Sequence, residues 1–481
     1  MKHLTALLLI IALLASCKPE AKVTCLISGT VKNTADKQIR LTLGTKIDTL
    51  IINADGTFSK EISVTKPSEA TLQGTKLFVT LFLIPGKDLV VTSDAADFNK
   101  DLAFGGALAP ENTYIIKKSE GDEKTYQVMN AAYRSPYTPS DFKRIRDSIR
   151  LADLAFLDKY VKDPGKLEPV FVERQKLVIQ FSYFGDLNNY PRMAGYYNTD
   201  KPVIPGDWYS FLDGVNLDDP KLLDISDAKY FIQSYVGNQA LKITGIPQEQ
   251  SYNNPEVIKA SLKYLQENFK SPEFYNLMAF ESLKGVIDSG GPGGLEELIS
   301  EYQAKSTDEV NKKSLKDMVD GWATMAPGQP APVFNLPDIS GKMVSLTDFA
   351  GKYVFIDYWA TWCGPCKAEV PEYKKLIEDY KGKNIVFMSI SVDKDKSAWE
   401  KMVREGLPEM DPATGKPFEP AKMIQMSWLQ LHDAVRYSKI WLVKFIPTFV
   451  LIDREGKIIN SRAQRPSNPE LRKVIDALPG I

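Results

Sequence analysis

The sequence predicts a multidomain protein with an N-terminal β-sandwich, a helical middle domain and a C-terminal α/β domain that contains a central insertion. Three observations indicate this fold class. Short strand-like runs fill residues 23–107, apolar residues follow a helical period in 108–325, and strands alternate with helices in 326–481. The length of 481 residues is enough for about two to four separate cores.

The β-rich segment consists of short apolar runs separated by turn residues. Strands at this spacing are typical of a sandwich. Cys25 lies in the expected first strand, where we interpret it as a small buried side chain. The other expected strands are 38–43, 47–52, 57–64, 77–84 and 89–92.

The middle segment has the apolar spacing of amphipathic helices. Phe142, Ile145 and Ile149 fall on one helical face, and Ile258 and Leu262 repeat the pattern further along. Between these helices we expect an irregular, aromatic-rich stretch over 181–211. Its aromatic residues could form a docking surface or pack inside the fold.

The N-terminus has the features of a targeting segment. Residues 1–16 are predicted to be a signal peptide, because Lys2 precedes an apolar run too short to span a bilayer comfortably. The sequence Leu14-Ala15-Ser16-Cys17 resembles the bacterial lipobox, which implies cleavage before Cys17 and lipidation of that cysteine. Residues 17–22 would then be a tether, and the protein would face the periplasm from a membrane. The alternative is ordinary secretion with Cys17 left free.

The charge balance excludes some functions. With 60 basic and 61 acidic residues, nothing indicates a nucleic-acid partner or an electrostatic membrane surface. No motif in the chain indicates an organic cofactor, so none is predicted.

The strongest chemical signal is the pair Cys363 and Cys366, which lies between an apolar run at 353–359 and an amphipathic helix. At a helix start, a cysteine meets the positive end of the helix dipole, which favours the thiolate that attacks other disulfides. The alternative is a structural zinc site, which needs two more ligands. Besides this pair, the possible Cys and His ligands are Cys17, Cys25, His3 and His432.

The segment Ile356–Cys366, with Pro371 beyond it, resembles the thioredoxin active site, and Ile446-Pro447-Thr448 matches the cis-proline loop. Upstream, Pro332-x-Phe334-x-Leu336 and a second motif at 346–352 narrow the resemblance to the extracytoplasmic reductases of the TlpA/ResA group. The segment 23–107 resembles the uncharacterised β-rich domain found ahead of envelope thioredoxins. The resemblance implies a thioredoxin fold for 326–481.

The resemblance also implies roles for individual residues. Cys363 would be the exposed attacking thiolate, and Cys366 would resolve the mixed disulfide, which leaves a redox-active Cys363–Cys366 disulfide. Asp357 would accept the proton of the resolving thiol, and burial should raise its pKa. Glu369 matches an acidic residue near the dithiol, although it could lie on a solvated helix face.

Five further residues are expected to contact substrate. Pro447 would be cis and would expose the backbone of Ile446 to an extended substrate segment. Trp362 would form part of an apolar rim, and the tight turn at the dithiol would come from Gly364 and Pro365.

The segment between Cys366 and Pro447 is longer than in a minimal thioredoxin. We expect a helix near 393–403 in this insertion, and we expect the insertion to cover or extend the substrate groove. His432 lies within it and could be either a proton shuttle or a packing residue.

Together these features predict a membrane-tethered thiol-disulfide oxidoreductase that reduces disulfides of envelope proteins. The resemblance implies an upstream membrane thiol reductant as electron donor, and substrates such as the heme-attachment cysteines of apocytochrome c. One alternative is a binding lipoprotein with an accessory thioredoxin domain. Another is a thiol peroxidase, although no proline lies between Tyr353 and Cys363 as the peroxidase motif would require.

Overall fold

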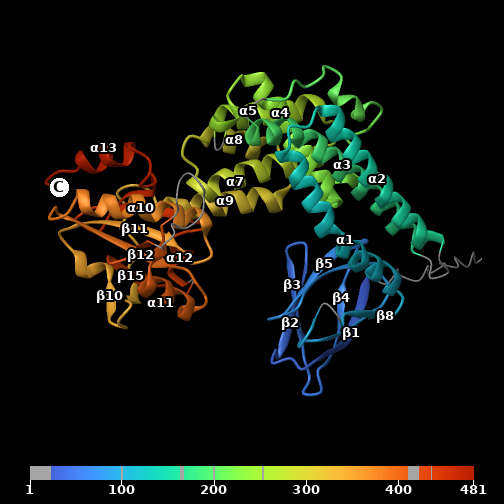
Figure 1. Ribbon diagram of the computed structural model, residues 1–481, viewed down its shortest axis with the longest axis horizontal. Coiled ribbons are helices and arrows are strands. Elements are labelled where there is room, and N and C mark those ends of the chain that lie inside the picture. Colours follow the sequence, from blue (N-terminus) through green and yellow to red (C-terminus); the bar gives the residue numbers. More distant parts are fainter. Residues whose placement is uncertain are drawn as a thin grey trace, which may run out of the picture. The chain divides into compact units, whose positions relative to one another are not determined.

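The computed structural model divides the chain into two compact units, residues 1–236 and 237–481, which are described separately (Figure 1). The division falls inside the predicted helical segment, and the predicted domain boundaries stay predictions. The expected signal peptide, Cys17 and the tether lie outside the described residues. The structure describes residues 23–98, 101–162, 167–198, 201–251, 254–409, 422–434 and 436–481.

The first unit contains two four-stranded sheets. Strand β1 is central to the first sheet, where it runs antiparallel to β4 and parallel to β7. The order of the first sheet is β4 (Thr57–Ser63), β1 (Thr24–Lys32), β7 (Leu89–Asp94) and β8 (Ala103–Gly105). The order of the second sheet is β3 (Lys46–Ile51), β2 (Gln38–Leu43), β5 (Ser68–Gln73) and β6 (Phe78–Leu83).

One hydrophobic core joins both sheets to three helices. Ile27 of β1 and Leu41 of β2 belong to the same buried cluster as Tyr114 and Phe171 from the helices. Alternate residues of β1 and β2 enter this core, as expected for strands with one buried face. The helices are α1 (Ala109–Arg134), α2 (Pro139–Lys162) and α3 (Pro169–Tyr197).

The expectation of an irregular stretch over 181–211 is wrong for its first part. Helix α3 continues to Tyr197, and the chain then forms short 3-10 turns at Trp208–Leu212 and Pro220–Asp224. Phe181, Tyr183 and Tyr190 are buried on this helix. Because α3 is covered on several sides, its apolar residues do not follow one stripe, and the helical period is hidden in the sequence.

Helices and an α/β domain make up the second unit. Helix α4 (Ser226–Thr244) crosses the division between the units. Arg462 joins the helices to the α/β domain within this unit, since its Nε donates to the carbonyl of Ser289 and its guanidinium lies 4.5 Å from the ring centre of Trp322. The following helices are α5 (Pro255–Asn268), α6 (Pro272–Phe274), a π-turn (Tyr275–Ala279), α7 (Phe280–Gly290), α8 (Glu296–Lys305) and α9 (Glu309–Ala323).

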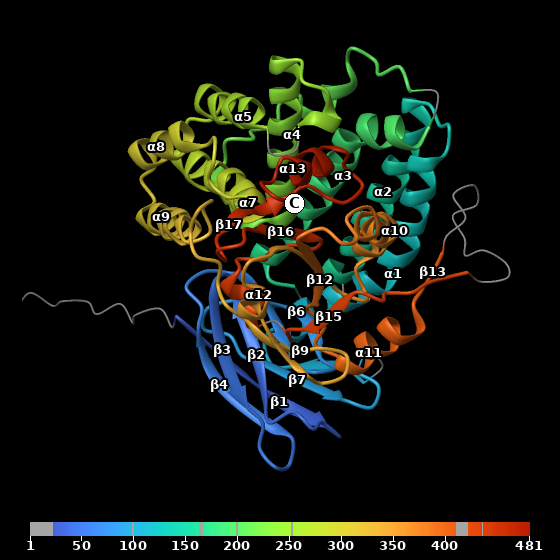
Figure 2. The same cartoon turned by 90° about the vertical axis from the view of Figure 1, so that its left-hand side faces the viewer.

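The α/β domain is built on a five-stranded sheet in the order β15-β12-β11-β16-β17. Strands β15, β12 and β11 are parallel, and β16 and β17 are antiparallel to their neighbours. Helices α10 (Gly364–Asp379) and α13 (Glu470–Asp476), both labelled in Figure 2, belong to this domain. They share a buried cluster with one face of the sheet through Tyr373, Leu376 and Leu471. The sheet strands are β15 (Leu429–His432), β12 (Ile385–Ser391), β11 (Tyr353–Trp359), β16 (Thr448–Ile452) and β17 (Ile458–Ala463).

The remaining elements surround this sheet. The predicted helix in the insertion is present as α11. Among the described helices, none has both the length and the apolar character needed to cross a bilayer. The elements are α10 (Gly364–Asp379), α11 (Lys396–Glu405), α12 (Arg436–Ile440), α13 (Glu470–Asp476) and the short pairs β9 (Asn335–Pro337) with β10 (Met343–Ser345) and β13 (Leu407–Pro408) with β14 (Met423–Ile424).

In the first unit, one buried side chain joins a helix to the edge of a sheet. Asn112 of α1 accepts a hydrogen bond from the backbone N–H of Phe82 at 2.8 Å and donates to its carbonyl at 3.1 Å. Phe82 lies in β6, an edge strand, so these two backbone groups have no neighbouring strand on that side. Asn112 is fully buried and therefore supplies the partners that water cannot.

We expect Asn112→Ala to destabilise the first unit by about 2–4 kcal/mol, because it leaves a buried N–H and a buried C=O unpaired. Chemical unfolding followed by circular dichroism measures the change. The matched control is Asn130→Ala on the same helix, where the side chain accepts a hydrogen bond from the exposed Arg134. Equal losses of stability in the two variants would contradict this account of Asn112.

Candidate active site

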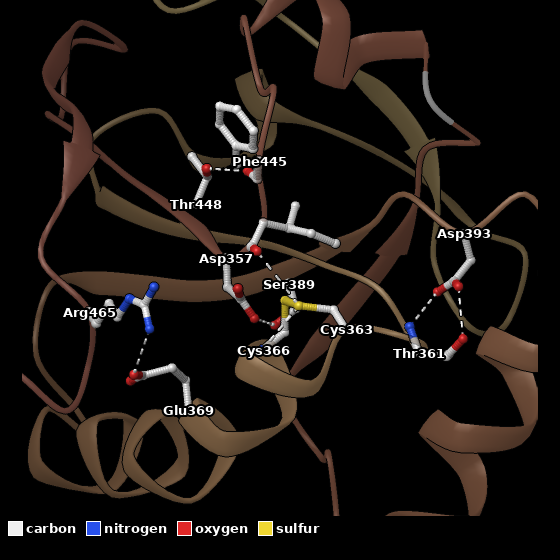
Figure 3. The surroundings of a disulfide bond; sticks show 11 residues. Asp357, Thr361, Cys363, Cys366, Glu369, Ser389, Asp393, Phe445, Thr448 and Arg465 are labelled. Carbon is white, nitrogen blue, oxygen red and sulfur yellow. Dashed lines mark hydrogen bonds and ion pairs between the residues drawn. A yellow bond between two sulfur atoms is a disulfide. The ribbon is translucent and has the colours of Figure 1, made fainter. Parts of the chain in front are cut away.

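The two cysteines lie at the point where strand β11 gives way to helix α10. Cys363 is the N-cap residue of α10, and it forms a disulfide with Cys366 in the first turn, with an S–S distance of 2.02 Å (Figure 3). Every residue of β11 is buried, so a fixed strand leads into this turn. Gly364 and Pro365 occupy the first helical positions, where a missing proline N–H is not needed.

The start of α10 is arranged to stabilise negative charge on Cys363. The backbone N–H of Cys366 points at the Cys363 sulfur, with a nitrogen–sulfur distance of 3.1 Å. This N–H has no partner within the helix, and it lies at the positive end of the helix dipole. In the reduced protein both features favour the Cys363 thiolate over the thiol.

The expected exposure of Cys363 is not found in this oxidised form. The side chains of Cys363 and Cys366 are 5% and 3% exposed, so neither sulfur stands clear of the surface. Both belong to a buried cluster with Trp359 and Val370 of the neighbouring elements. Trp362, in contrast, is 69% exposed, as expected for a residue at the rim of the site.

The loop before β16 lies against the disulfide. The peptide bond between Ile446 and Pro447 is cis, as the resemblance implies. The Ile446 carbonyl oxygen lies 3.7 Å from the Cys363 sulfur, and the Thr448 hydroxyl donates to the carbonyl of Phe445 at 2.7 Å (Figure 3). Residues far apart in the sequence are thus brought together at Cys363.

A cavity of about 640 Å³ opens beside the disulfide. Exposed apolar side chains of Trp362 and Phe445 line it, together with Ile446. Residues 392–395 and Ala398 of the insertion line another part of this cavity. Ser438, Val443 and Lys444, from the segment before the cis peptide, also line this cavity.

Asp393 is a site residue that sequence reasoning did not identify. Its carboxylate accepts hydrogen bonds from the Thr361 backbone N–H at 3.0 Å and from the Thr361 hydroxyl at 2.8 Å. Ser391 donates to the same carboxylate at 2.7 Å. Asp393 therefore anchors the turn that leads to Cys363. An acid two residues after the strand over 385–391 was the available sequence signal.

Asp357 is buried on β11, with its carboxyl directed toward the disulfide (Figure 3). The hydroxyl of Ser389 on β12 donates to this carboxyl at 3.0 Å. The pKa of Asp357 is raised to about 7, mainly by burial; the Ser389 hydrogen bond opposes the rise, and the nearby charge of Glu369 adds a smaller increase. A carboxyl with a pKa near neutrality can both take and release a proton at working pH.

Glu369 is buried rather than on a solvated helix face, with an exposed fraction of 7%. Its carboxylate accepts hydrogen bonds from the Ser467 backbone N–H at 3.0 Å and from the Ser467 hydroxyl at 2.8 Å. Arg465 lies 3.9 Å away on the same loop. Glu369 thus ties α10 to the loop after β17, and a role for it in proton transfer stays a prediction.

The other candidate residues have packing surroundings. His432 is buried, its Nε2 lies 2.8 Å from the Asp393 carbonyl oxygen, and its ring lies 5.1 Å from that of Trp399. Cys25 is buried in the first unit, where burial raises the pKa of its thiol to about 12, with a smaller effect from Asp88. In the described part of the chain, no cluster of three or more Cys, His, Asp or Glu side chains is arranged to hold a metal.

The pKa of Asp357 predicts how stability depends on pH. Because the folded value of about 7 lies above the unfolded value, the native state holds the extra proton between about pH 4 and 7. The free energy of unfolding should therefore fall as pH rises through this window. Compared with Asp357→Asn, the oxidised wild type should lose about 4 kcal/mol more of its free energy of unfolding as the pH rises through this window. Urea unfolding at a series of pH values measures the difference.

Asp338→Asn is the control for this measurement. Hydrogen bonds from Ser340, both side chain and backbone, lower the pKa of Asp338, so its contribution should have the opposite sign. If the free energy of unfolding depends on pH in the same way in wild type and Asp357→Asn, burial does not raise the pKa of Asp357.

The α/β domain is similar to known redox proteins. Residues 327–461 match the AhpC/TSA family. A thiol-disulfide oxidoreductase named ResA from Bacillus thuringiensis subsp. konkukian is 30% identical over 148 residues, which cover 31% of this chain and 76% of that protein. ResA of Bacillus subtilis is 29% identical over 139 residues, which cover 29% of this chain and 68% of that protein. A solved thiol-disulfide oxidoreductase from Bacteroides fragilis is 27% identical, covering 31% of this chain and all of that one, with a TM-score of 0.24.

The family match contains the main candidate residues of the site. Cys363 and Cys366, Asp357, Glu369 and Pro447 all fall within residues 327–461. The matches cover more than two thirds of each of these two relatives. The chain therefore belongs to the ResA-like thiol-disulfide oxidoreductases of the AhpC/TSA family, enzymes with the thioredoxin fold.

Proposed function

We propose that this protein is a membrane-tethered reductase of disulfides in envelope proteins, acting through Cys363 and Cys366. The observation that supports it best is the placement of the disulfide at the start of α10, facing the cis Ile446–Pro447 peptide, with a buried carboxyl at Asp357. The Gly364-Pro365 dipeptide is of the thioredoxin type, which favours reduction over oxidation or isomerisation.

The proposed reaction starts from the dithiol. The Cys363 thiolate attacks one sulfur of a substrate disulfide, forms a mixed disulfide and releases the first substrate thiolate. The Asp357 carboxylate then takes the proton of the Cys366 thiol. The Cys366 thiolate attacks the Cys363 sulfur, which breaks the mixed disulfide and releases the second substrate thiolate. Two electrons have moved from the dithiol to the substrate, and the Cys363–Cys366 disulfide remains.

A second dithiol must restore the reduced form. We propose a membrane thiol reductant as that donor, because the proposed location is the cell envelope. Substrates in the same compartment include proteins such as apocytochrome c, whose heme-attachment cysteines must be reduced. The groove at Ile446 and Pro447 would bind an extended substrate backbone, with Trp362 as an apolar contact.

The tether and the N-terminal segment complete the proposal. Leu14-Ala15-Ser16-Cys17 supports lipidation at Cys17, and hence a lipid-anchored protein facing the periplasm. We also propose that the two N-terminal sheets form a β-sandwich over 23–107, since side chains of both belong to one core. In the sequence, the helical segment 108–325 would follow this domain and precede the thioredoxin-like domain, 326–481.

A ligand-binding lipoprotein with an accessory redox domain is the second candidate. It is favoured by a cavity of about 750 Å³ between loops 31–37 and 51–56 of the first unit, which has no part in the proposed reaction. Under this alternative, full-length Cys363→Ala would keep its cellular role. Under the reductase proposal it would not.

Cys366→Ala should accumulate mixed disulfides with envelope proteins, because the remaining Cys363 thiolate attacks but no second thiol resolves the intermediate. Trapped partners are detected on non-reducing gels. Cys363→Ala should trap nothing and should slow insulin reduction at least about a hundredfold. Cys25→Ala is the matched control and should behave as wild type, since that thiol is buried in another unit. If Cys366→Ala traps no protein in vivo, the proposed substrate class is wrong.

Cys17→Ser should release the protein from membranes, because it removes the site of acylation and with it the buried acyl chains. Partition between aqueous and detergent phases measures the effect. Cys25→Ser controls for the loss of any cysteine. Wild-type protein found entirely in the aqueous phase would argue for ordinary secretion instead.

A further inference from the structure

The insertion, which lies between β12 and β16, is linked to the buried acid of the active site through Trp428. Trp428 directly precedes β15, and its indole Nε1 lies 2.8 Å from the hydroxyl oxygen of Ser389. The Ser389 hydroxyl lies 3.0 Å from Oδ2 of Asp357. Ser389 is fully buried, so water does not compete for its hydrogen bonds. The three groups form a continuous chain from the insertion to the acid.

The chemistry of the three groups determines which of them donates each hydrogen bond and which accepts it. An indole N–H can only donate, so the Ser389 oxygen must be its acceptor. The single hydroxyl proton of Ser389 is then free to point at the Asp357 carboxylate, which can only accept when ionised. A donor whose own oxygen already accepts a hydrogen bond is polarised and donates more strongly. Trp428 thus orients Ser389 and strengthens its bond to the carboxylate.

We propose that Ser389, oriented by Trp428, is a positioning residue that sets the proton affinity of Asp357, and so the pH at which Cys366 loses its proton. The inference deepens the proposed function, since it rests on Asp357 as the acceptor of that proton. In the mixed disulfide, the Cys366 proton passes to the Asp357 carboxylate, the Cys366–Cys363 bond forms, and the bond from Cys363 to the substrate sulfur breaks. No further oxidant or reductant is required.

The other groups around Asp357 act in different ways. Glu369 on α10 raises the pKa of Asp357 through its charge, and burial raises it more. Tyr373 on α10 also faces Ser389, and burial holds its own pKa well above the usual value, so it stays neutral. Its hydroxyl donates to the carbonyl of Met388 at 2.8 Å. Phe449, the β16 partner of Asp357, is apolar. Ser389 is therefore the group that stabilises the ionised carboxylate.

The test is the titration of Asp357 in the oxidised full-length protein, followed by NMR of ¹³C-labelled aspartate carboxyls. Ser389→Ala removes the donor and should raise the midpoint of the Asp357 titration by about one pH unit, which is a tenfold increase in proton affinity. Trp428→Phe keeps an aromatic ring beside Tyr373 but removes the N–H. It should move the midpoint in the same direction by a smaller amount, and it provides the test if Ser389→Ala does not fold.

Ser391→Ala is the matched control. Ser391 lies two residues further along the same strand and on the same face, is equally buried, and donates to Asp393 instead of Asp357. Its loss should leave the Asp357 titration unchanged. The inference is overturned if the midpoint does not move in Ser389→Ala, or if it moves equally in Ser391→Ala.

The readout also separates this inference from the proposed function. The titration needs neither substrate nor reduced protein, so it can succeed even if the wild type reduces no protein disulfide. If the wild type does reduce insulin, Ser389→Ala should shift the pH profile of that reaction to higher pH along with the carboxyl. A lower rate with an unchanged pH profile would mean that Ser389 only supports the fold, which contradicts the inference.

Discussion

The burial of one carboxyl, that of Asp357, is the constraint on which the rest of the site depends. An ionised acid in an apolar interior is unstable, so this group holds its proton up to about neutral pH. Asp357 lies on the buried strand β11, and its carboxyl is directed toward the disulfide at the start of α10 (Figure 3). The structure thus combines a helix terminus that favours a thiolate with an acid that can accept a proton nearby.

The site is assembled from segments far apart in the chain. The N-cap and first turn of α10 provide the sulfurs, the loop before β16 provides the cis peptide, and Asp393 holds the turn before Cys363. The turns and loops that carry these groups lie at the ends of β12, β11 and β16, which are neighbours in one sheet. A rigid central sheet therefore keeps the reacting groups in position, as a preorganised site requires.

The insertion contacts the active site in two different places. Residues 392–395 line the cavity beside the disulfide, whereas Trp428 reaches inward to Ser389. The first can affect which substrate binds, whereas the second acts on the partner of Asp357 and packs against the core of the domain.

In the first unit, Asn112 has a comparable structural role, because it forms hydrogen bonds with the backbone of Phe82 in an edge strand.

Local patterns alone were enough to predict the dithiol at a helix start, helix α11 and most strands of the two N-terminal sheets and of the five-stranded sheet. These features depend on neighbouring residues. Local patterns missed the polar strand β5, the continuation of α3 and the short strand β15, whose side chains are arranged by tertiary contacts. Only the folded chain decided that Cys363 is shielded in its oxidised form and that Glu369 meets Ser467. It also decided that Trp428 reaches Ser389. Such contacts join distant residues, and no periodicity or spacing in the sequence records them.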